Sequence, residues 1–203
     1  MTKYSQVWPG MGCDGSKVAD VIDTNPSGEE EEVDFTELET DTIRSTWPLL
    51  AADIETTGVK VFLRLFYEEP KVKSIFGRYG EMEEVDLMRS ESFKEHAVKF
   101  MNVVDELVEN MDQPKTHIQQ TLMMLGAKHA TFEGFKVEYF QAYSKSLIDV
   151  WEYAIGEEFI PEVRECWTDF FDYLTKYMCQ GYDIFINETD VTCNGGGSKL
   201  RSE

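Results

Sequence analysis

The sequence of 203 residues predicts an all-α fold. Throughout residues 35–187, apolar side chains recur at steps of three and four, the spacing of a helix with one buried face. Runs of valine, isoleucine and threonine that alternate with polar residues are missing, so we expect no β-strands. The flanking segments 1–34 and 188–203 are polar, with an acidic run in the first and three consecutive glycines in the second. We therefore predict one helical domain, 35–187, between flexible extensions.

Two local signals define the first two helices. Thr36 and Glu39, three residues apart, form a capping-box pattern, which predicts a helix that begins there and continues through Trp47. A second helix is expected through Gly58 to an end near Pro70, because proline cannot continue a helix. A short helical turn over residues 70–76 and a polar connection with two glycines follow.

Four longer helices complete the predicted domain. The first of them contains His96 and ends around Asp112, and Pro114 suits the first turn of the next, which contains His129. The last two helices are expected over residues 135–155 and 161–186.

His96 and His129 each lie on the apolar face of a predicted helix. A buried imidazole needs partners for its ring nitrogens, and no acidic residue shares either face. Two such histidines on different helices can hold one metal ion, or the iron of one haem, between them. The alternative is that both are core histidines satisfied by neighbouring groups. His117 lies off the apolar face of its helix and is expected to be solvated.

Composition narrows the classes of function. With 19 Lys and Arg against 39 Asp and Glu, the formal net charge is −20, which argues against binding of nucleic acid or anionic lipid through bulk electrostatics. The four cysteines show neither the CxxC spacing of metal sites nor a dense disulfide framework. No stretch has the apolar length of a transmembrane helix or the core of a signal peptide, so we expect a cytoplasmic protein.

Several landmarks, in order along the chain, resemble those of the globin family. The spacings among six residues resemble those of the first three globin helices: Trp47, Gly58, Phe62, Phe66, Pro70 and Phe76. The segment around His96 resembles the distal part of the E helix, and the Leu-Gly-x-x-His pattern that ends at His129 resembles the end of the F helix that supplies the proximal ligand. The interval between the histidines, 129 − 96 = 33, is similar to that of neuroglobin and globin X and longer than that of myoglobin. The resemblance covers about residues 36–187 and implies the globin fold, a three-on-three sandwich of six to eight helices.

The resemblance also implies a cofactor, haem b. His129 matches the proximal ligand, and His96 matches the distal position, where it binds the iron or donates a hydrogen bond to a bound gas. The other residues expected to contact the haem are Phe62, Phe76, Arg78, Phe93, Lys99, Phe100, Val103, Leu125, Phe135 and Tyr139. Lys99 and Arg78 would reach the haem propionates, although ordinary surface cations would look the same. Phe100 stands where many oxygen carriers have a smaller aliphatic residue, which argues against simple oxygen storage.

These observations lead to one main hypothesis and two alternatives. The main hypothesis is a globin with bis-histidine hexacoordinated iron, which binds O2, CO or NO after His96 is displaced and acts in redox chemistry, in nitric oxide or nitrite chemistry, or in sensing. Nitric oxide dioxygenase or nitrite reductase side activity would need an external reductase or electron-transfer partner, since no flavin or nicotinamide domain is recognisable. The alternatives are a pentacoordinate globin for oxygen storage or transport, and a haem-free globin-fold interaction module.

A second, shorter resemblance concerns the membrane. Met11, Gly12 and Cys13 resemble an N-myristoylation site with an adjacent cysteine for palmitoylation, as in membrane-anchored globins. Because Met11 is internal, this modification requires translation to start there or removal of residues 1–10. Stable attachment takes two lipid chains, so we expect membrane association only if Gly12 and Cys13 are acylated.

Overall fold

The computed structural model describes residues 35–112 and 115–194. Within these ranges the chain forms eight α-helices, two 3-10 turns and no strand, which agrees with the predicted all-α fold. The helices are α2 (Glu37–Ala51), α3 (Ile54–Glu68), α4 (Pro70–Ile75), α5 (Glu84–Arg89), α6 (Glu91–Glu109), α7 (Lys115–Ala130), α8 (Glu138–Ile155) and α9 (Pro161–Asn194), and the 3-10 turns are η2 (Gly77–Tyr79) and η3 (Gly156–Glu158). The expectations for Pro114, Gly12 and Cys13 fall outside the described residues.

Side-chain caps begin several of these helices. At α2 the predicted capping box is present: the Glu39 amide donates to the Thr36 hydroxyl at 3.2 Å, and the Thr36 amide donates to the Glu39 carboxylate at 2.6 Å. The Asp53 carboxylate accepts from the Thr56 amide at the start of α3. Hydrogen bonds from the side chain and the amide of Thr56 lower the pKa of Asp53. Ser90 caps α6 in the same way through the Phe93 amide.

Two helix boundaries and one additional helix differ from the prediction. The last helix was expected to end at Ile186, but α9 continues to Asn194, inside the segment predicted to be flexible. No proline or glycine lies between these two residues, and the Thr189 hydroxyl donates to the Phe185 and Ile186 carbonyls, so nothing stops the helical hydrogen bonds. Helix α5 was not predicted within the polar connection. Helix α8 begins at Glu138 rather than Phe135, because Gly134 has a positive φ of 80° and places Phe135 in the preceding turn.

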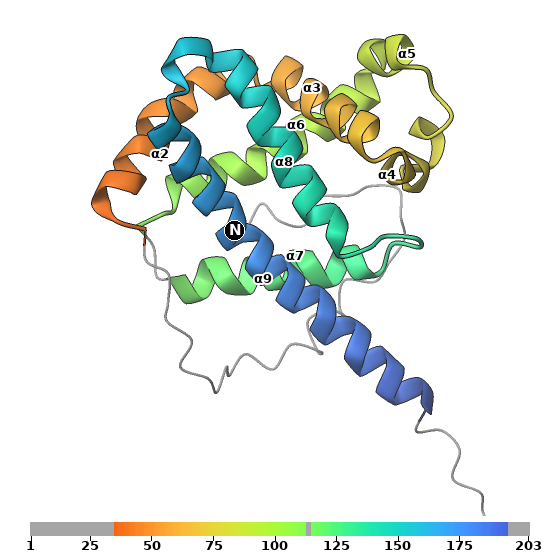
Figure 1. Ribbon diagram of the computed structural model, residues 1–203. Helices are drawn as coiled ribbons and strands as arrows, with labels where there is room; N and C mark the ends of the chain where they lie inside the picture. Colours follow the sequence, from red (N-terminus) through yellow and green to blue (C-terminus); the bar gives the residue numbers. More distant parts are fainter. Residues whose placement is uncertain (1–34, 113–114, 195–203) are drawn as a thin grey trace, which may run out of the picture.

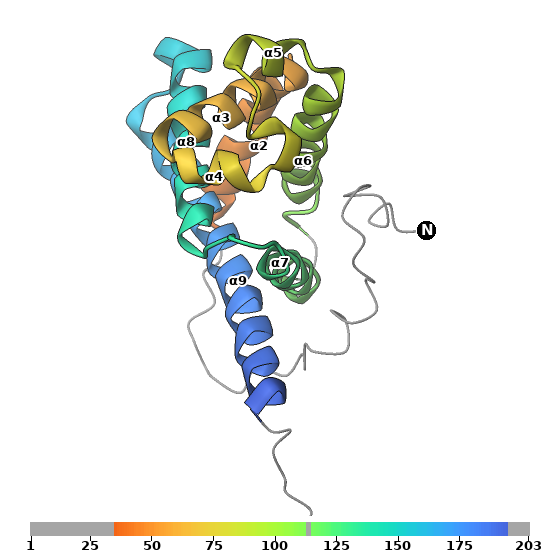
Figure 2. The same cartoon turned by 90° about the vertical axis from the view of Figure 1, so that its right-hand side faces the viewer.

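The helices pack in a crossed arrangement around two hydrophobic clusters. Helices α8 and α9 lie side by side, and α7 packs across α9 (Figures 1 and 2). The carboxyl-terminal end of α9 projects beyond α7 in both views. None of the helices in the described ranges is both long enough and apolar enough to cross a membrane.

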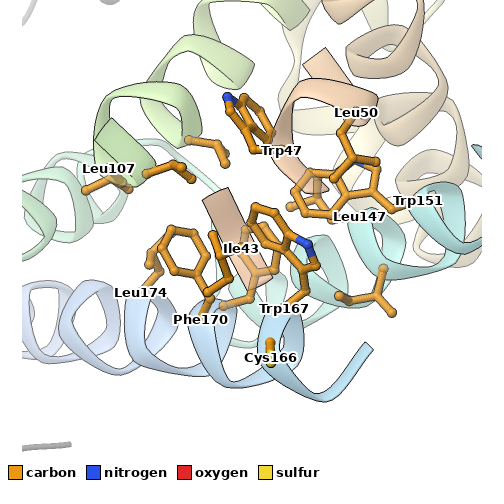
Figure 3. Close-up of a cluster of buried hydrophobic side chains, with 14 of the residues drawn as sticks. Ile43, Trp47, Leu50, Leu107, Leu147, Trp151, Cys166, Trp167, Phe170 and Leu174 are labelled. Atoms are coloured by element: carbon orange, nitrogen blue, oxygen red, sulfur yellow. The ribbon is translucent and has the colours of Figure 1, made fainter. Parts of the chain in front are cut away.

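The larger cluster lies where α2, α8 and α9 meet, around three tryptophans (Figure 3). The rings of Trp151 and Trp167 are 4.7 Å apart, and Trp47 lies 6.1 Å from Trp167. Two of the indole N–H groups are satisfied: Trp47 donates to Asp105 at 2.6 Å, and Trp167 donates to the buried Thr46 hydroxyl at 2.9 Å. This arrangement fixes α2 against the two carboxyl-terminal helices.

Beside the smaller cluster, α3 and α6 approach closely at Gly58. A Cβ built on Gly58 would lie 3.1 Å from the Ala97 carbonyl oxygen and 2.9 Å from Met101 Cγ. Gly58 and Ala97 therefore lie at the crossing of the two helices. Phe62, Phe66 and Phe93 pack against one another beside this crossing.

Candidate functional site

A cavity of about 480 Å³ lies between α6 and α7, with walls from α3, α4, α8 and α9. It is lined mainly by aromatic and aliphatic side chains. The predicted site residues that line it are His96, His129, Phe62, Phe76, Arg78, Phe100, Phe135 and Tyr139. Its volume and apolar lining match those of sites that enclose a large hydrophobic ligand.

The remaining predicted site residues do not line the cavity. Phe93 is fully buried behind it, with its ring 5.9 Å from that of Phe62. Val103 is half-buried and packs against the tryptophan cluster. Lys99 is half-buried near His96, where its charge helps to lower the pKa of that imidazole. Leu125 contacts His129 through its backbone carbonyl.

His129 is held in one orientation by its own helix. Its Nδ1 lies 2.7 Å from the Leu125 carbonyl oxygen, one turn earlier in α7. A carbonyl only accepts hydrogen bonds, so Nδ1 carries the proton and the Nε2 lone pair is left for another partner. This is the arrangement by which proteins fix the tautomer of a metal-binding histidine.

Aromatic rings enclose His129 on the α8 side. The ring centroids of Phe132, Phe135 and Phe140 lie 5.6, 5.0 and 5.2 Å from that of the imidazole. The turn that carries Phe135 is tied to α9, because the Tyr182 hydroxyl donates to the Phe135 carbonyl at 3.1 Å. The turn after α7 therefore stays packed against the imidazole.

His96 approaches the cavity from α6, within a separate set of rings. Its imidazole lies 5.3 Å from Phe62, 5.5 Å from Phe76 and 6.3 Å from Tyr79, between ring centroids. The exposed Arg78 guanidinium lies over the Tyr79 ring and donates to its hydroxyl at 2.9 Å. Arg78 thus marks the side on which the cavity meets solvent.

Both imidazoles are neutral at physiological pH. Burial lowers the pKa of His96 to about 4, with smaller contributions from Lys99 and His129. Burial likewise lowers the pKa of His129 to about 4, against the opposing effect of the hydrogen bond to Leu125. A neutral imidazole is the form that donates a lone pair to a metal.

The side chains at the cavity fit a metal ion that is already coordinated by a larger organic group. Within residues 35–112 and 115–194, no group of three or more His, Cys, Asp or Glu side chains could form a metal cage. A bare cation would therefore lack ligands here. A flat, apolar group with a central metal needs only one or two protein ligands, and the cavity offers one imidazole from each of two helices together with aromatic walls.

Several residues of the cavity wall were not predicted from the sequence as site residues: Phe132, Phe140, Tyr143, Tyr79 and Met178. Their three- and four-residue spacing along α8 and α9 did place Phe140, Tyr143 and Met178 on buried faces. That signal shows that a side chain points inward, and it does not distinguish a core neighbour from a cavity. His117 is exposed on α7, as predicted.

Comparisons with known proteins point to one family. The Globin family model matches residues 59–178. Cytoglobin-2 of Danio rerio is 32% identical over 149 residues, which cover 72% of this chain and 82% of the relative. Neuroglobin-1 of Oncorhynchus mykiss is 28% identical over 149 residues, covering 73% and 92%. A solved structure described as a hexacoordinated heme protein from an anhydrobiotic tardigrade superposes with a TM-score of 0.69 at 21% identity, over 73% of this chain and 96% of that one.

Proposed function

The chain belongs to the globin family, and on this premise we propose that it binds haem b in the cavity between His96 and His129. The observation that carries the proposal is the placement of two neutral imidazoles, from α6 and α7, at one apolar cavity. The iron of a bound haem supplies the position at which O2, CO or NO binds and the electron that redox chemistry exchanges.

We assign His129 as the permanent ligand. Its Nδ1 hydrogen bond to Leu125 leaves Nε2 as the donor atom, and the surrounding phenylalanines keep the ring from turning. The hydrogen bond also increases the basicity of the imidazole, which strengthens its bond to a metal.

We assign His96 as the second, displaceable ligand. The rings of Phe62 and Phe76 confine its imidazole, and burial keeps it neutral. Phe100 occupies part of the same side of the cavity, which restricts the volume left for an external ligand. An external gas must then compete with His96, so its apparent affinity is its intrinsic affinity multiplied by the fraction of protein in which the histidine has moved away.

Such a site suits redox or signalling chemistry with O2, NO or nitrite better than bulk oxygen transport. We propose that an external reductase or electron-transfer partner supplies the electron. We also propose that the protein acts in the cytoplasm. The half-buried Lys99, whose charge acts on His96, and the exposed Arg78, which lines the cavity, are our candidates to meet the haem propionates.

The visible absorption spectrum of the reduced, haem-loaded protein without oxygen tests these assignments. We expect the sharp, split bands of low-spin iron with two histidine ligands. The variant His96→Leu should show the single broad band of an open site. The variant His117→Leu is the matched control, because it removes an exposed histidine from α7 and should keep the split bands.

Each contrary spectrum points to a different alternative. One broad band in the unmodified protein would mean a pentacoordinate globin for oxygen storage or transport. Split bands that persist in His96→Leu would mean that the second ligand is not His96. No haem band at all would leave a haem-free interaction module.

A further inference from the structure

Tyr143 on α8 belongs to the wall on the His96 side of the cavity. Its ring centroid lies 4.2 Å from that of Phe100 and 5.7 Å from that of Phe62. Phe62 in turn lies 5.3 Å from the His96 imidazole. The rings around His129 are a different set, Phe132, Phe135 and Phe140.

The phenol group of Tyr143 is unusual among the residues of this wall. Tyr143 lines the cavity, and its hydroxyl is buried without a hydrogen-bond partner among the described residues. Burial raises the pKa of Tyr143 well above 10, so the hydroxyl keeps its proton and remains a donor. Leaving a buried donor unpaired is costly, and a phenylalanine would fill nearly the same volume without that cost.

We propose that the Tyr143 hydroxyl donates a hydrogen bond to a polar diatomic ligand held on the His96 side of the cavity. This inference rests on the haem binding proposed above and adds a second donor to that side. A ligand such as O2 becomes partly negative when it binds to reduced iron, and a donor enclosed by apolar rings stabilises that charge more than a solvated one does. Because Tyr143 comes from α8, it keeps its place when His96 on α6 swings away.

The test compares Tyr143→Phe, which removes only the hydroxyl, with Tyr173→Phe. Tyr173 is a buried tyrosine of the tryptophan cluster and does not line the cavity, so its variant controls for loss of a buried phenol hydroxyl. The first readout is the C–O stretching frequency of the CO complex. A hydrogen bond to the ligand oxygen weakens the C–O bond, so Tyr143→Phe should raise the frequency and Tyr173→Phe should leave it unchanged.

The second readout is O2 dissociation, measured in the unmodified protein and in the His96→Leu background. We expect Tyr143→Phe to speed dissociation about tenfold, the effect of losing one hydrogen bond to a partly charged ligand. The effect should persist in the His96→Leu background, because Tyr143 acts without His96. Unchanged CO frequency and O2 dissociation in variants that retain the haem band would overturn the proposal.

Thermal unfolding of the haem-free variants separates a ligand contact from a structural one. If the hydroxyl has no partner in the folded protein, Tyr143→Phe should unfold at the same or a higher temperature than the unmodified chain. A clear loss of thermal stability would show a structural partner and overturn the proposal. Absence of a haem band in the unmodified protein would instead remove the proposed function, and this inference with it.

Discussion

The backbone of Gly126 on α7 lies directly against the backbone of Met178 on α9: a Cβ built on Gly126 would be 1.9 Å from the Met178 carbonyl oxygen. The contact is reciprocal, because a Cβ on Gly181 would be 1.9 Å from the Met123 carbonyl oxygen. The two helices can approach this closely only where both lack side chains. Since His129 lies three residues after Gly126, the same contact sets the position of the imidazole in the cavity.

The variant Gly126→Ala should therefore force α7 away from α9. Backbone atoms cannot rotate aside, so we expect the free energy of unfolding to fall by about 3 kcal/mol or more, the upper range for overpacked sites. Haem affinity should fall as well, because His129 moves with the helix. Chemical denaturation and haem titration measure the two effects. The exposed Gln120→Ala on the same helix serves as the control, and equal stability of Gly126→Ala and the unmodified protein would contradict the contact.

The same substitution at Gly58 should be tolerated better. There a new Cβ would meet Met101 Cγ at 2.9 Å and the Ala97 carbonyl oxygen at 3.1 Å. The methionine side chain is flexible, and alanine gains about 1 kcal/mol over glycine within a helix. We expect Gly58→Ala to change the free energy of unfolding by less than about 1.5 kcal/mol. Chemical denaturation of Gly58→Ala and Gly126→Ala under the same conditions measures the difference. A loss as large as that of Gly126→Ala would show that α3 and α6 cannot adjust at their crossing.

The sequence predicted the elements that depend on local chemistry. The capping box at Thr36 marks the start of α2, and the apolar spacing around His96 and His129 placed both histidines on buried faces. Each of these signals lies within a single helix.

The parts that could not be predicted depend on how helices meet in space. Phe93, Lys99 and Val103 share a helix with His96, yet the rotation of α6 turns them away from the cavity. The step of three residues from Phe140 indicates that Tyr143 faces inward, but the rings that it meets depend on the packing of α8 against α3 and α6. A periodic pattern gives the direction of a side chain relative to its own helix and gives no information about the neighbour it meets.

The hydrogen bond between Trp167 and Thr46 should contribute measurably to stability. The Thr46 hydroxyl accepts from the indole N–H at 2.9 Å in the tryptophan cluster, and both groups are buried. The variant Thr46→Val keeps the volume but leaves the indole donor unpaired, so the free energy of unfolding should fall by about 1–3 kcal/mol. Thr42→Val is the control, because its hydroxyl donates to the exposed Leu38 carbonyl and accepts from no indole. Equal thermal unfolding of the two variants would mean that the indole finds another acceptor.

The assignment of His129 as the permanent ligand leads to a prediction about ligand removal and replacement. The variant His129→Gly deletes the imidazole and leaves a space enclosed by Phe132, Phe135 and Phe140. Haem affinity should fall by more than about 100-fold, since loss of outer-shell partners alone costs 10- to 100-fold. Free imidazole should then enter the space and restore the haem absorption band. The exposed His117→Gly on the same helix should show neither the loss nor the rescue. Full haem binding by His129→Gly without added imidazole would transfer the role of main ligand to His96, the other imidazole at the cavity.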